Sequence, residues 1–253
     1  MSSRDAFDMR LRAWRQRLFQ DPREIRFMLR HLRPGDTAVD VGAFRGAYAY
    51  WMLKAVGPTG RVVCFEPQPA LVTYLRKVKS SLRMERLDVL PFAASSRRGD
   101  RSISVPGEGP DPGGTLETGL GSQHMIYLVE ATTLDAHFPA GTPVKLIKCD
   151  VEGHEFDVFL GAARILKEQR PILIIEREEE GHPRHAARDV FAFLQGLDYV
   201  GAFFSRRGLR PLAEFDPARH GQRGSQDYAN SFVFRARETL TGLARATRPA
   251  RMG

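Results

Sequence analysis

Residues 39–48 read VDVGAFRGAY, and this stretch decides the fold of the chain. The apolar run at residues 37–42 predicts a buried strand, and Gly42 and Gly46 predict a tight turn into a helix. A strand, a glycine turn and a helix in this order form the first unit of a mainly parallel sheet. Ligands of such sheets bind at the carboxyl ends of the strands, so we expect this loop to line a binding site.

Apolar runs alternate with helix-period segments along the rest of the chain, which predicts an α/β fold. Further strands are expected at residues 61–66, 87–93, 144–150, 171–176, 199–204 and 230–236. Helices are expected at residues 4–20, 22–32, 46–56, 67–80, 155–169 and 184–196. Residues 101–105 and 125–133 alternate in polarity and predict a small antiparallel insertion. The Gly- and Pro-rich segment between them, residues 106–122, is a candidate lid.

This pattern predicts one main domain, residues 36–237, with an appendage at each end. Residues 1–35 are expected to form helices that act as a cap or an interface, and residues 238–253 a basic tail. Four apolar residues recur at helical spacing in the first helix: Phe7, Leu11, Trp14 and Leu18. We expect this apolar stripe to pack onto the chain's own sheet or to roof the binding site. The alternative is an interface, which would allow a homo-oligomer.

The net charge of +8 raises the question of a nucleic-acid partner. The arginines are spread along the chain and no basic block is interleaved with aromatic residues, so nucleic acid is not favoured. No apolar run is long enough to span a membrane, and the N-terminus is too charged for a secretory signal. A cytoplasmic location is therefore expected. Cys64 and Cys149 lie in apolar runs and are expected to be buried free thiols.

Four acidic residues lie at the carboxyl ends of predicted strands: Asp40, Glu66, Asp150 and Glu176. Glu66 follows the glycine loop at the distance of an acid that binds both ribose hydroxyls of a nucleoside cofactor. The loop has neither the G-x-G-x-x-G spacing of dinucleotide sites nor a Walker motif, and Asp40 would repel phosphates. The cationic amino and sulfonium groups of S-adenosylmethionine fit better. The alternative for Asp40 is a helix cap or a buried acid bonded to local backbone.

The chain resembles FkbM-type S-adenosylmethionine-dependent methyltransferases. The motifs that carry the resemblance run in family order: 39-VDVGAFRGAY-48, 65-FEPQP-69, 93-AAS-95, 132-TTLD-135, 146-LIKCDVEGHE-155, 161-GA-162, 170-RPILIIE-176 and, more weakly, 230-NSFVF-234. DVEGHE is the most specific of them. The resemblance implies a class I methyltransferase (Rossmann-like) fold of seven strands in the order 3-2-1-4-5-7-6, with strand seven antiparallel. It also implies O-methylation of a hydroxyl on a small molecule, saccharide or natural product.

The same resemblance implies which residues meet the cofactor. Asp40, Gly42 and Gly46 would hold its methionine part, with Ala43 and Asp150 on the same side. Glu66 would bind the ribose, and backbone near Ala93 would meet the adenine.

Phe44 departs from the family pattern, which usually has Asn at this place. Either the backbone amides of the loop suffice and Phe44 packs over the cofactor or the next helix, or cofactor binding is weakened or lost. The implied sheet order also places Cys64 and Cys149 two strands, about 9.6 Å, apart. A disulfide requires Cα atoms within about 7 Å, so we predict none.

Transfer of a methyl group to oxygen needs a base that takes the hydroxyl proton. His154 follows the strand at residues 144–150, and an imidazole suits this role at neutral pH. We expect His154 as the base, oriented by Glu152 or Asp150, while Asp150 lies on the cofactor side. The alternative is that His154 and Glu155 only cap the next helix.

Two further site hypotheses concern this edge of the sheet. Asp150, Glu152 and Glu176, together with His154, could hold a divalent cation such as magnesium, although nothing in their spacing requires one. A metal-free site is therefore favoured. His182 and His185 are expected in a solvated loop, with the rim of an acceptor site as the alternative.

Other function classes remain open beside the methylation of a small acceptor. An RNA ribose or other nucleic-acid methyltransferase is disfavoured, because DVEG replaces the N/D-P-P-Y/F motif and Cys149 follows Lys148 rather than a proline. A non-catalytic module that binds S-adenosylmethionine or a partner would use the apolar stripe as its interface. A nicotinamide dehydrogenase is the most distant class, since the glycine spacing does not suit a pyrophosphate.

Overall fold

The computed structural model describes residues 3–106, 114, 116, 124–177 and 187–240. Its main sheet has eight strands: β1 (Thr37–Val41), β2 (Arg61–Phe65), β3 (Leu87–Leu90), β7 (Leu146–Cys149), β8 (Ile172–Glu176), β9 (Tyr199–Ser205), β10 (Gly208–Pro211) and β11 (Ser231–Ala236). They lie in the order β3-β2-β1-β7-β8-β11-β9-β10. The first five in this order run parallel, and β11 is antiparallel to both β8 and β9. The expected order of seven strands is confirmed.

The eighth strand, β10, was not predicted from the sequence. It forms an antiparallel hairpin with β9 at the edge of the sheet and alternates between half-buried and exposed residues. Arg210 and Pro211 lie in it, and such residues are typical of edge strands that must not pair further. Because only β9 holds this strand, its sequence carries little of the apolar alternation that marks a strand.

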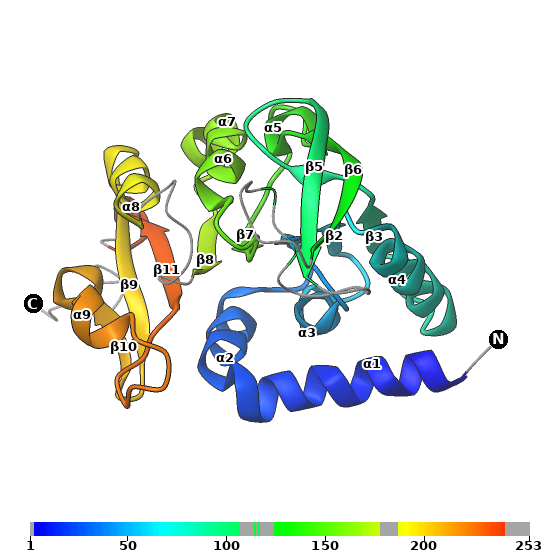
Figure 1. Cartoon of the computed structure of the whole chain (residues 1–253), viewed down its shortest axis with the longest axis horizontal. Helices are drawn as coiled ribbons and strands as arrows, with labels where there is room; N and C mark the ends of the chain where they lie inside the picture. Colours follow the sequence, from blue (N-terminus) through cyan, green and yellow to red (C-terminus); the bar gives the residue numbers. More distant parts are fainter. Residues whose placement is uncertain (1–2, 107–113, 115, 117–123, 178–186, 241–253) are drawn as a thin grey trace, which may run out of the picture.

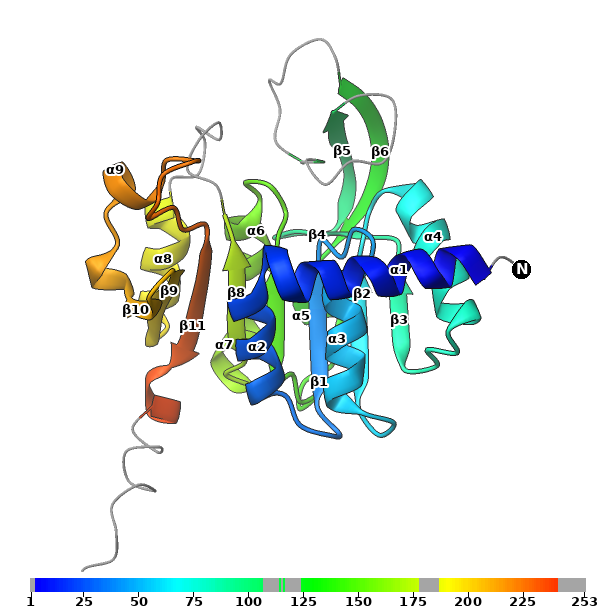
Figure 2. The ribbon, with the colours of Figure 1, turned by 90° about the horizontal axis from the view of Figure 1, so that it is seen from below.

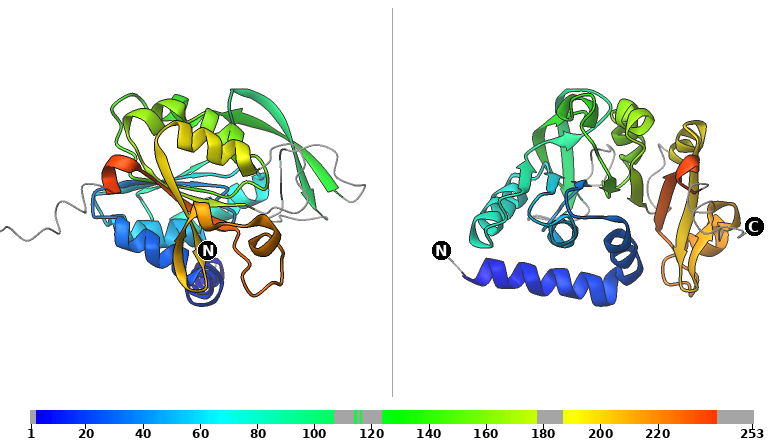
Figure 3. Two further views of the ribbon diagram at one scale, coloured as in Figure 1. Left: turned by 90° about the vertical axis from the view of Figure 1, so that its left-hand side faces the viewer. Right: turned by 180° about the vertical axis from the view of Figure 1, so that it is seen from behind.

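Helices cover both faces of the sheet, as the views in Figures 1 and 3 show. One layer contains α2 (Pro22–His31), α3 (Ala47–Val56) and α4 (Pro69–Ser81). The opposite layer contains α5 (Leu134–His137), α6 (Glu155–Leu160), α7 (Ala163–Glu168) and α8 (Ala187–Gly196). A short helix, α9 (Pro217–His220), lies near β10. The strands alternate accordingly: Val39 and Val41 of β1 belong to one core cluster, and Ala38 to the other.

The helix expected over residues 155–169 is divided into α6 and α7. The division falls at Gly161, where an added Cβ would stand 2.0 Å from the carbonyl oxygen of Ser95. The backbone after β4 (Ala93–Ala94) therefore passes so close to residue 161 that only glycine fits at the division.

The expected antiparallel insertion is present as β5 (Gly99–Pro106) and β6 (His124–Thr132). β4 adds to β6 in parallel, and the three strands form a separate sheet that projects from the domain (Figure 2). Most of the candidate lid, residues 106–122, lies outside the described residues; Gly114 and Leu116 are described.

The N-terminal segment forms α1 (Ser3–Arg15) and a π-helical turn (Gln16–Gln20). α1 packs on α3 and α4 through Met9 and Ala13, which are fully buried. The predicted apolar stripe is exposed: the exposed fractions of Phe7, Leu11, Trp14 and Leu18 are 64%, 59%, 45% and 54%, although the Trp14 ring meets Trp51 of α3 edge-on at 4.9 Å. The part of the expectation that the stripe packs onto the sheet is wrong, because Met9 and Ala13, on the opposite side of α1, make the contact with α3 and α4. The part that places the stripe over a binding site is met by Leu11, which lines a cavity at the carboxyl edge of the sheet. An interface between copies stays a prediction.

Cys64 of β2 and Cys149 of β7 are both buried and free, as predicted. They lie on either side of β1, so one strand separates them. Within the described part of the chain, no helix is long and apolar enough to cross a membrane.

Candidate functional site

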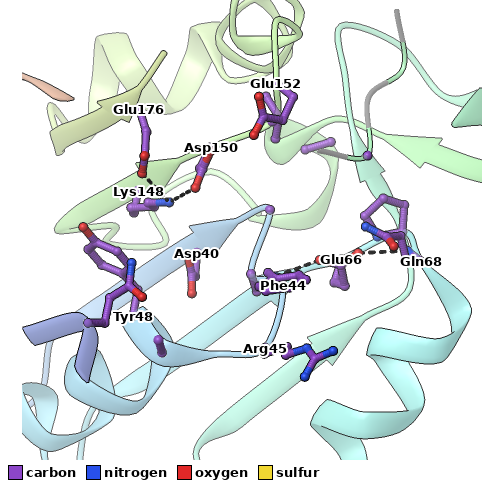
Figure 4. A pocket seen from close by; sticks show the side chains of 18 of the residues that line it. Asp40, Phe44, Arg45, Tyr48, Glu66, Gln68, Lys148, Asp150, Glu152 and Glu176 are labelled. Atoms are coloured by element: carbon purple, nitrogen blue, oxygen red, sulfur yellow. Dashed lines mark hydrogen bonds and ion pairs between the residues drawn. The ribbon is translucent and has the colours of Figure 1, made fainter. Parts of the chain in front are cut away.

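A cavity of about 500 Å³ opens at the carboxyl edge of the sheet (Figure 4). Its walls come from the ends of β1, β2, β7 and β8, from the insertion and from α1. Six of the residues predicted to meet a cofactor line it: Asp40, Gly42, Ala43, Glu66, Ala93 and Asp150. The predicted base and the further metal candidates also line it: His154, Glu152 and Glu176. Parallel strands bring these distant residues together because their carboxyl ends share one edge.

The two glycines of the loop after β1, Gly42 and Gly46, have different neighbours. Gly42 has a φ of +75° and lies against the end of β7, where a Cβ would stand 1.8 Å from the carbonyl oxygen of Asp150. Gly46 also has a φ of +75°, but its Cβ position faces Leu75 and Met9, at 2.8 and 2.9 Å. The structure therefore places Gly46 in the packing of α1 and α4 on the loop, whereas Gly42 lines the cavity.

Glu66 is held in place by the loop that it faces. Its Oε2 accepts a hydrogen bond from the amide of Phe44 at 2.8 Å, and its Oε1 accepts one from the amide of Gln68 at 2.9 Å. Burial raises the pKa of Glu66 to about 7, although the two amides lower it. Each carboxylate oxygen keeps a further lone pair, so the fixed group can accept two more hydrogen bonds from a ligand.

The backbone bears on the departure of Phe44 from the expected Asn. Phe44 has a φ of +48°, in the left-handed region that Asn adopts far more readily than Phe. Its amide nevertheless makes the bond to Glu66, and its ring lies 5.4 Å from the guanidinium carbon of Arg45. The loop thus keeps its shape with Phe at this position, at the cost of backbone strain.

We expect Phe44→Asn to stabilise the protein by about 1 kcal/mol, because Asn tolerates a left-handed backbone. Urea unfolding would measure the change. The matched control is Arg83→Asn, since Arg83 has a φ of +51° and does not line the cavity. Both variants should gain stability. A loss in Phe44→Asn beside a gain in Arg83→Asn would show that packing of the Phe44 ring outweighs the strain.

Lys148 was missed in the sequence analysis, although a lysine inside an apolar strand is an unusual feature that calls for partners. It lies on β7, and its side chain is 3% exposed. Its Nζ is 2.6 Å from Asp150 Oδ2 and 3.8 Å from Glu176 Oε2. Burial opposes its charge, but the three carboxylates of Asp150, Glu176 and Asp40 raise the pKa of Lys148 above its usual value. The ammonium is therefore a permanent positive charge in the cavity floor.

The negative charge of this floor exceeds the positive charge. Asp40 is 1% exposed, and its Oδ2 is buried with no hydrogen-bond partner among the described residues. Burial raises the pKa of Asp40 to about 6, although Lys148 lowers it. The charge of Asp150, followed by burial, raises the pKa of Glu176 well above its usual range. Three carboxyl groups thus share one ammonium, which suits a ligand with a positive end.

The residues suggested for a divalent cation already surround a cation of the protein, because Lys148 is bonded to Asp150 and lies close to Glu176. In the described ranges, no group of three or more His, Cys, Asp or Glu residues is arranged to hold a metal ion. The arrangement fits an organic cation beside Asp40 better than a dication between Asp150 and Glu176.

His154 lines the cavity, and two neighbouring side chains contact its ring. Its Nε2 is 3.0 Å from Ser95 Oγ, and its Nδ1 is 4.0 Å from Asp157 Oδ2. We expected Glu152 or Asp150 to orient this ring, but these two contacts come from Ser95 and Asp157. The capping alternative is met by the backbone, because His154 is the N-cap residue of α6 and Glu155 accepts a hydrogen bond from the amide of Gly153, but the His154 side chain makes no cap hydrogen bond. His182 and His185 lie outside the described residues.

The family model described as the methyltransferase FkbM domain matches residues 40–200. No curated protein matches the chain. A solved structure of methyltransferase FkbM from Methylobacillus flagellatus KT is similar, with a TM-score of 0.50 and 18% identity. The alignment covers 83% of this chain and 50% of that one, so the chain spans half the length of this relative.

Two further solved structures are similar at slightly lower scores. An S-adenosylmethionine-dependent methyltransferase from Aquifex aeolicus has a TM-score of 0.49 and 16% identity, over 91% of this chain and 97% of that one. An rRNA methylase from Streptococcus thermophilus has a TM-score of 0.49 and 12% identity, over 84% and 93%. The family match covers more than half of the 253 residues and includes the ends of β1, β2, β7 and β8. The chain therefore belongs to the FkbM methyltransferase domain family.

Proposed function

We propose that the chain uses S-adenosylmethionine to methylate a hydroxyl oxygen of a small molecule or saccharide. The observation that carries the proposal is the buried Oδ2 of Asp40, which lies in the cavity floor without a hydrogen-bond partner among the described residues. A buried carboxylate oxygen of this kind calls for a donor or a positive charge from a ligand. The amino and sulfonium groups of S-adenosylmethionine supply both.

The other residues of the cavity are consistent with the rest of this cofactor. Glu66 offers two fixed carboxylate oxygens, which suit the two ribose hydroxyls. Gly42 and Ala43 keep the loop small beside Asp150, where the methionine part would lie. Ala93 lines the cavity on the side proposed for the adenine.

The bound cofactor would supply a methyl group activated by its sulfonium. The protein would align the acceptor hydroxyl and take its proton. We assign the proton to His154, whose ring lines the cavity: with Nε2 donating to Ser95 Oγ, the proton is taken at Nδ1, and Asp157, whose Oδ2 lies 4.0 Å from that nitrogen, stabilises the imidazolium that forms. A general base of this kind contributes about a hundredfold or more to the rate. If His154→Gln binds the cofactor like the wild type and methylates the acceptor at an unchanged rate, His154 is not the base.

Isothermal titration calorimetry with S-adenosylmethionine and S-adenosylhomocysteine tests the cofactor. Loss of a hydrogen bond to a charged group costs about 1.5–3 kcal/mol, so Glu66→Gln and Asp40→Asn should weaken S-adenosylmethionine binding by about tenfold or more. The control is Asp88→Asn on β3, outside the cavity lining, which should bind like the wild type. No heat from either ligand would contradict the proposal. A methyl-labelled cofactor would then identify the acceptor class, and label on RNA instead of small hydroxyl compounds would move the acceptor to nucleic acid.

The raised pKa values of Asp40, about 6, and Glu66, about 7, predict opposite pH effects on stability and binding. Because both are raised above their unfolded values, the folded state binds more protons. Stability without ligand should therefore fall as pH rises from about 4.5 to about 7. Affinity for S-adenosylmethionine should rise over the same window, because the ligand favours the ionised carboxylates. Calorimetry across this range measures the affinity. Asp40→Asn should reduce the rise of affinity with pH in the lower part of the range. An affinity independent of pH in the wild type would contradict the assignment.

A further inference from the structure

The side of the cavity formed by α1 carries charge opposite to that of the floor. Arg12 and Arg15, one helical turn apart, line the cavity from α1, and Arg45 lines it from the loop after β1. Asp8 also lines this side. The floor holds Asp40, Asp150 and Glu176 instead, so the cavity is polarised across its width. A ligand that fills it would place positive charge toward β7 and β8 and negative charge toward α1.

Two hydrogen-bond donors on the α1 side have no acceptor among the described residues. The Nε of Arg12, a residue that lines the cavity, and the hydroxyl of Tyr74 on α4, which is not part of the lining, are both buried without a partner among the described residues. They belong to one neighbourhood: burial raises the pKa of Tyr74, while the charges of Arg12 and Arg45 lower it. A buried guanidinium N–H without an acceptor is costly, and an anion is the partner that fits it best.

We infer that α1 supplies an anion-binding site in the cavity, in which Arg12, assisted by Arg15, holds a carboxylate or phosphate group. The inference rests on the proposed function, because the anion is either the carboxylate of the cofactor's methionine part or an acidic group on the acceptor. Both sources offer the planar or tetrahedral oxygens that a guanidinium binds through two N–H groups. The family match begins at residue 40, so the domain and the N-terminal helix would share the ligand.

Two ligands that differ in the carboxylate separate the sources. S-adenosylhomocysteine carries the amino acid, whereas 5′-methylthioadenosine lacks it. If the anion is the carboxylate of the cofactor, Arg12→Gln should lower the affinity for S-adenosylhomocysteine by about tenfold. The affinity for 5′-methylthioadenosine should then stay within about twofold of the wild-type value. If the anion belongs to the acceptor, both ligands should bind Arg12→Gln as they bind the wild type. Inorganic phosphate should then bind the wild type and not Arg12→Gln.

Matched variants exclude a merely structural effect. Arg10→Gln removes the same charge from an exposed residue of α1 that does not line the cavity, and it should leave all three ligands unchanged. Arg12→Lys should bind between the wild type and Arg12→Gln, because it keeps the charge but loses the fork of donors. Thermal unfolding of each variant checks that the fold is intact.

The inference is overturned if Arg12→Gln binds S-adenosylhomocysteine, 5′-methylthioadenosine and phosphate as the wild type does. It is also overturned if Arg10→Gln produces the same losses, since these would then report net charge. Failure of the proposed function looks different: the wild type would bind neither nucleoside ligand. Phosphate binding to the wild type and to Arg12→Gln would still decide whether the anion site exists.

Discussion

Gly42→Ala is expected to destabilise the protein by about 4 kcal/mol, because two costs add at one position. The residue has a φ of +75°, which is strained for any residue with a Cβ. That Cβ would also stand 1.8 Å from the carbonyl oxygen of Asp150, so the ends of β1 and β7 would have to separate. Domains of this size are stable by about 5–15 kcal/mol, so the variant should lose a large share of its free energy of unfolding.

Gly141→Ala separates the two costs. Gly141 has a φ of +80°, close to that of Gly42, but an added Cβ would meet nothing within 4 Å. We expect this control to lose only the backbone term, about 1–2 kcal/mol. Urea unfolding of both variants gives the difference. Equal losses would show that β1 and β7 move apart easily, and the close approach at Gly42 would then carry no energetic weight.

Lys148→Met should be the second severe change, with a loss of about 3–5 kcal/mol at neutral pH. The substitution removes the ammonium that lies between Asp150 and Glu176 and leaves their charge uncompensated. Carboxyl groups with raised pKa values should then protonate more readily still. The loss should therefore shrink by more than half at about pH 5, which unfolding at the two pH values would measure.

Two variants make this result interpretable. Lys145→Met removes an exposed lysine just before β7 and should change stability little. Adding Glu176→Gln to Lys148→Met should restore part of the stability at neutral pH, because one of the repelling carboxylates is gone. A loss of equal size at both pH values would indicate that Lys148 matters for packing rather than for charge.

The fold could be predicted from the sequence because it follows from local periodicity and from the order of units. The strand at Thr37–Val41 and its glycine turn identify a parallel sheet, and the acids at the strand ends must then share one edge. The side of α1 that packs against α3 and α4 could not be predicted in this way. A stripe with Phe7 and Trp14 has the stronger apolar signal, but the residues of α1 that are fully buried against α3 and α4 are Met9 and Ala13.

The contents of the site were predictable only in part. Asp40 and Glu66 follow from their places after strands, whereas the approach of Lys148 to Glu176 joins β7 to β8 and depends on a strand register that no spacing records. The same holds for Gly46, whose left-handed backbone is visible as a glycine but whose contacts with Met9 come from a distant helix. A motif thus predicts where the backbone turns, and the tertiary packing decides what each side chain meets.

The position of β11 bears on how the chain can be made. Among the described residues β11 is the last strand along the chain, yet it lies between β8 and β9 and pairs with both. During synthesis those two strands leave the ribosome first, and each has an open edge until residues 231–236 arrive. A chain that stops before β11 would present two unpaired edges and the apolar surface that Phe232 and Phe234 bury. Such a chain should aggregate or be degraded rather than persist as a partly active fragment, so the last strand ensures that only chains translated through it accumulate.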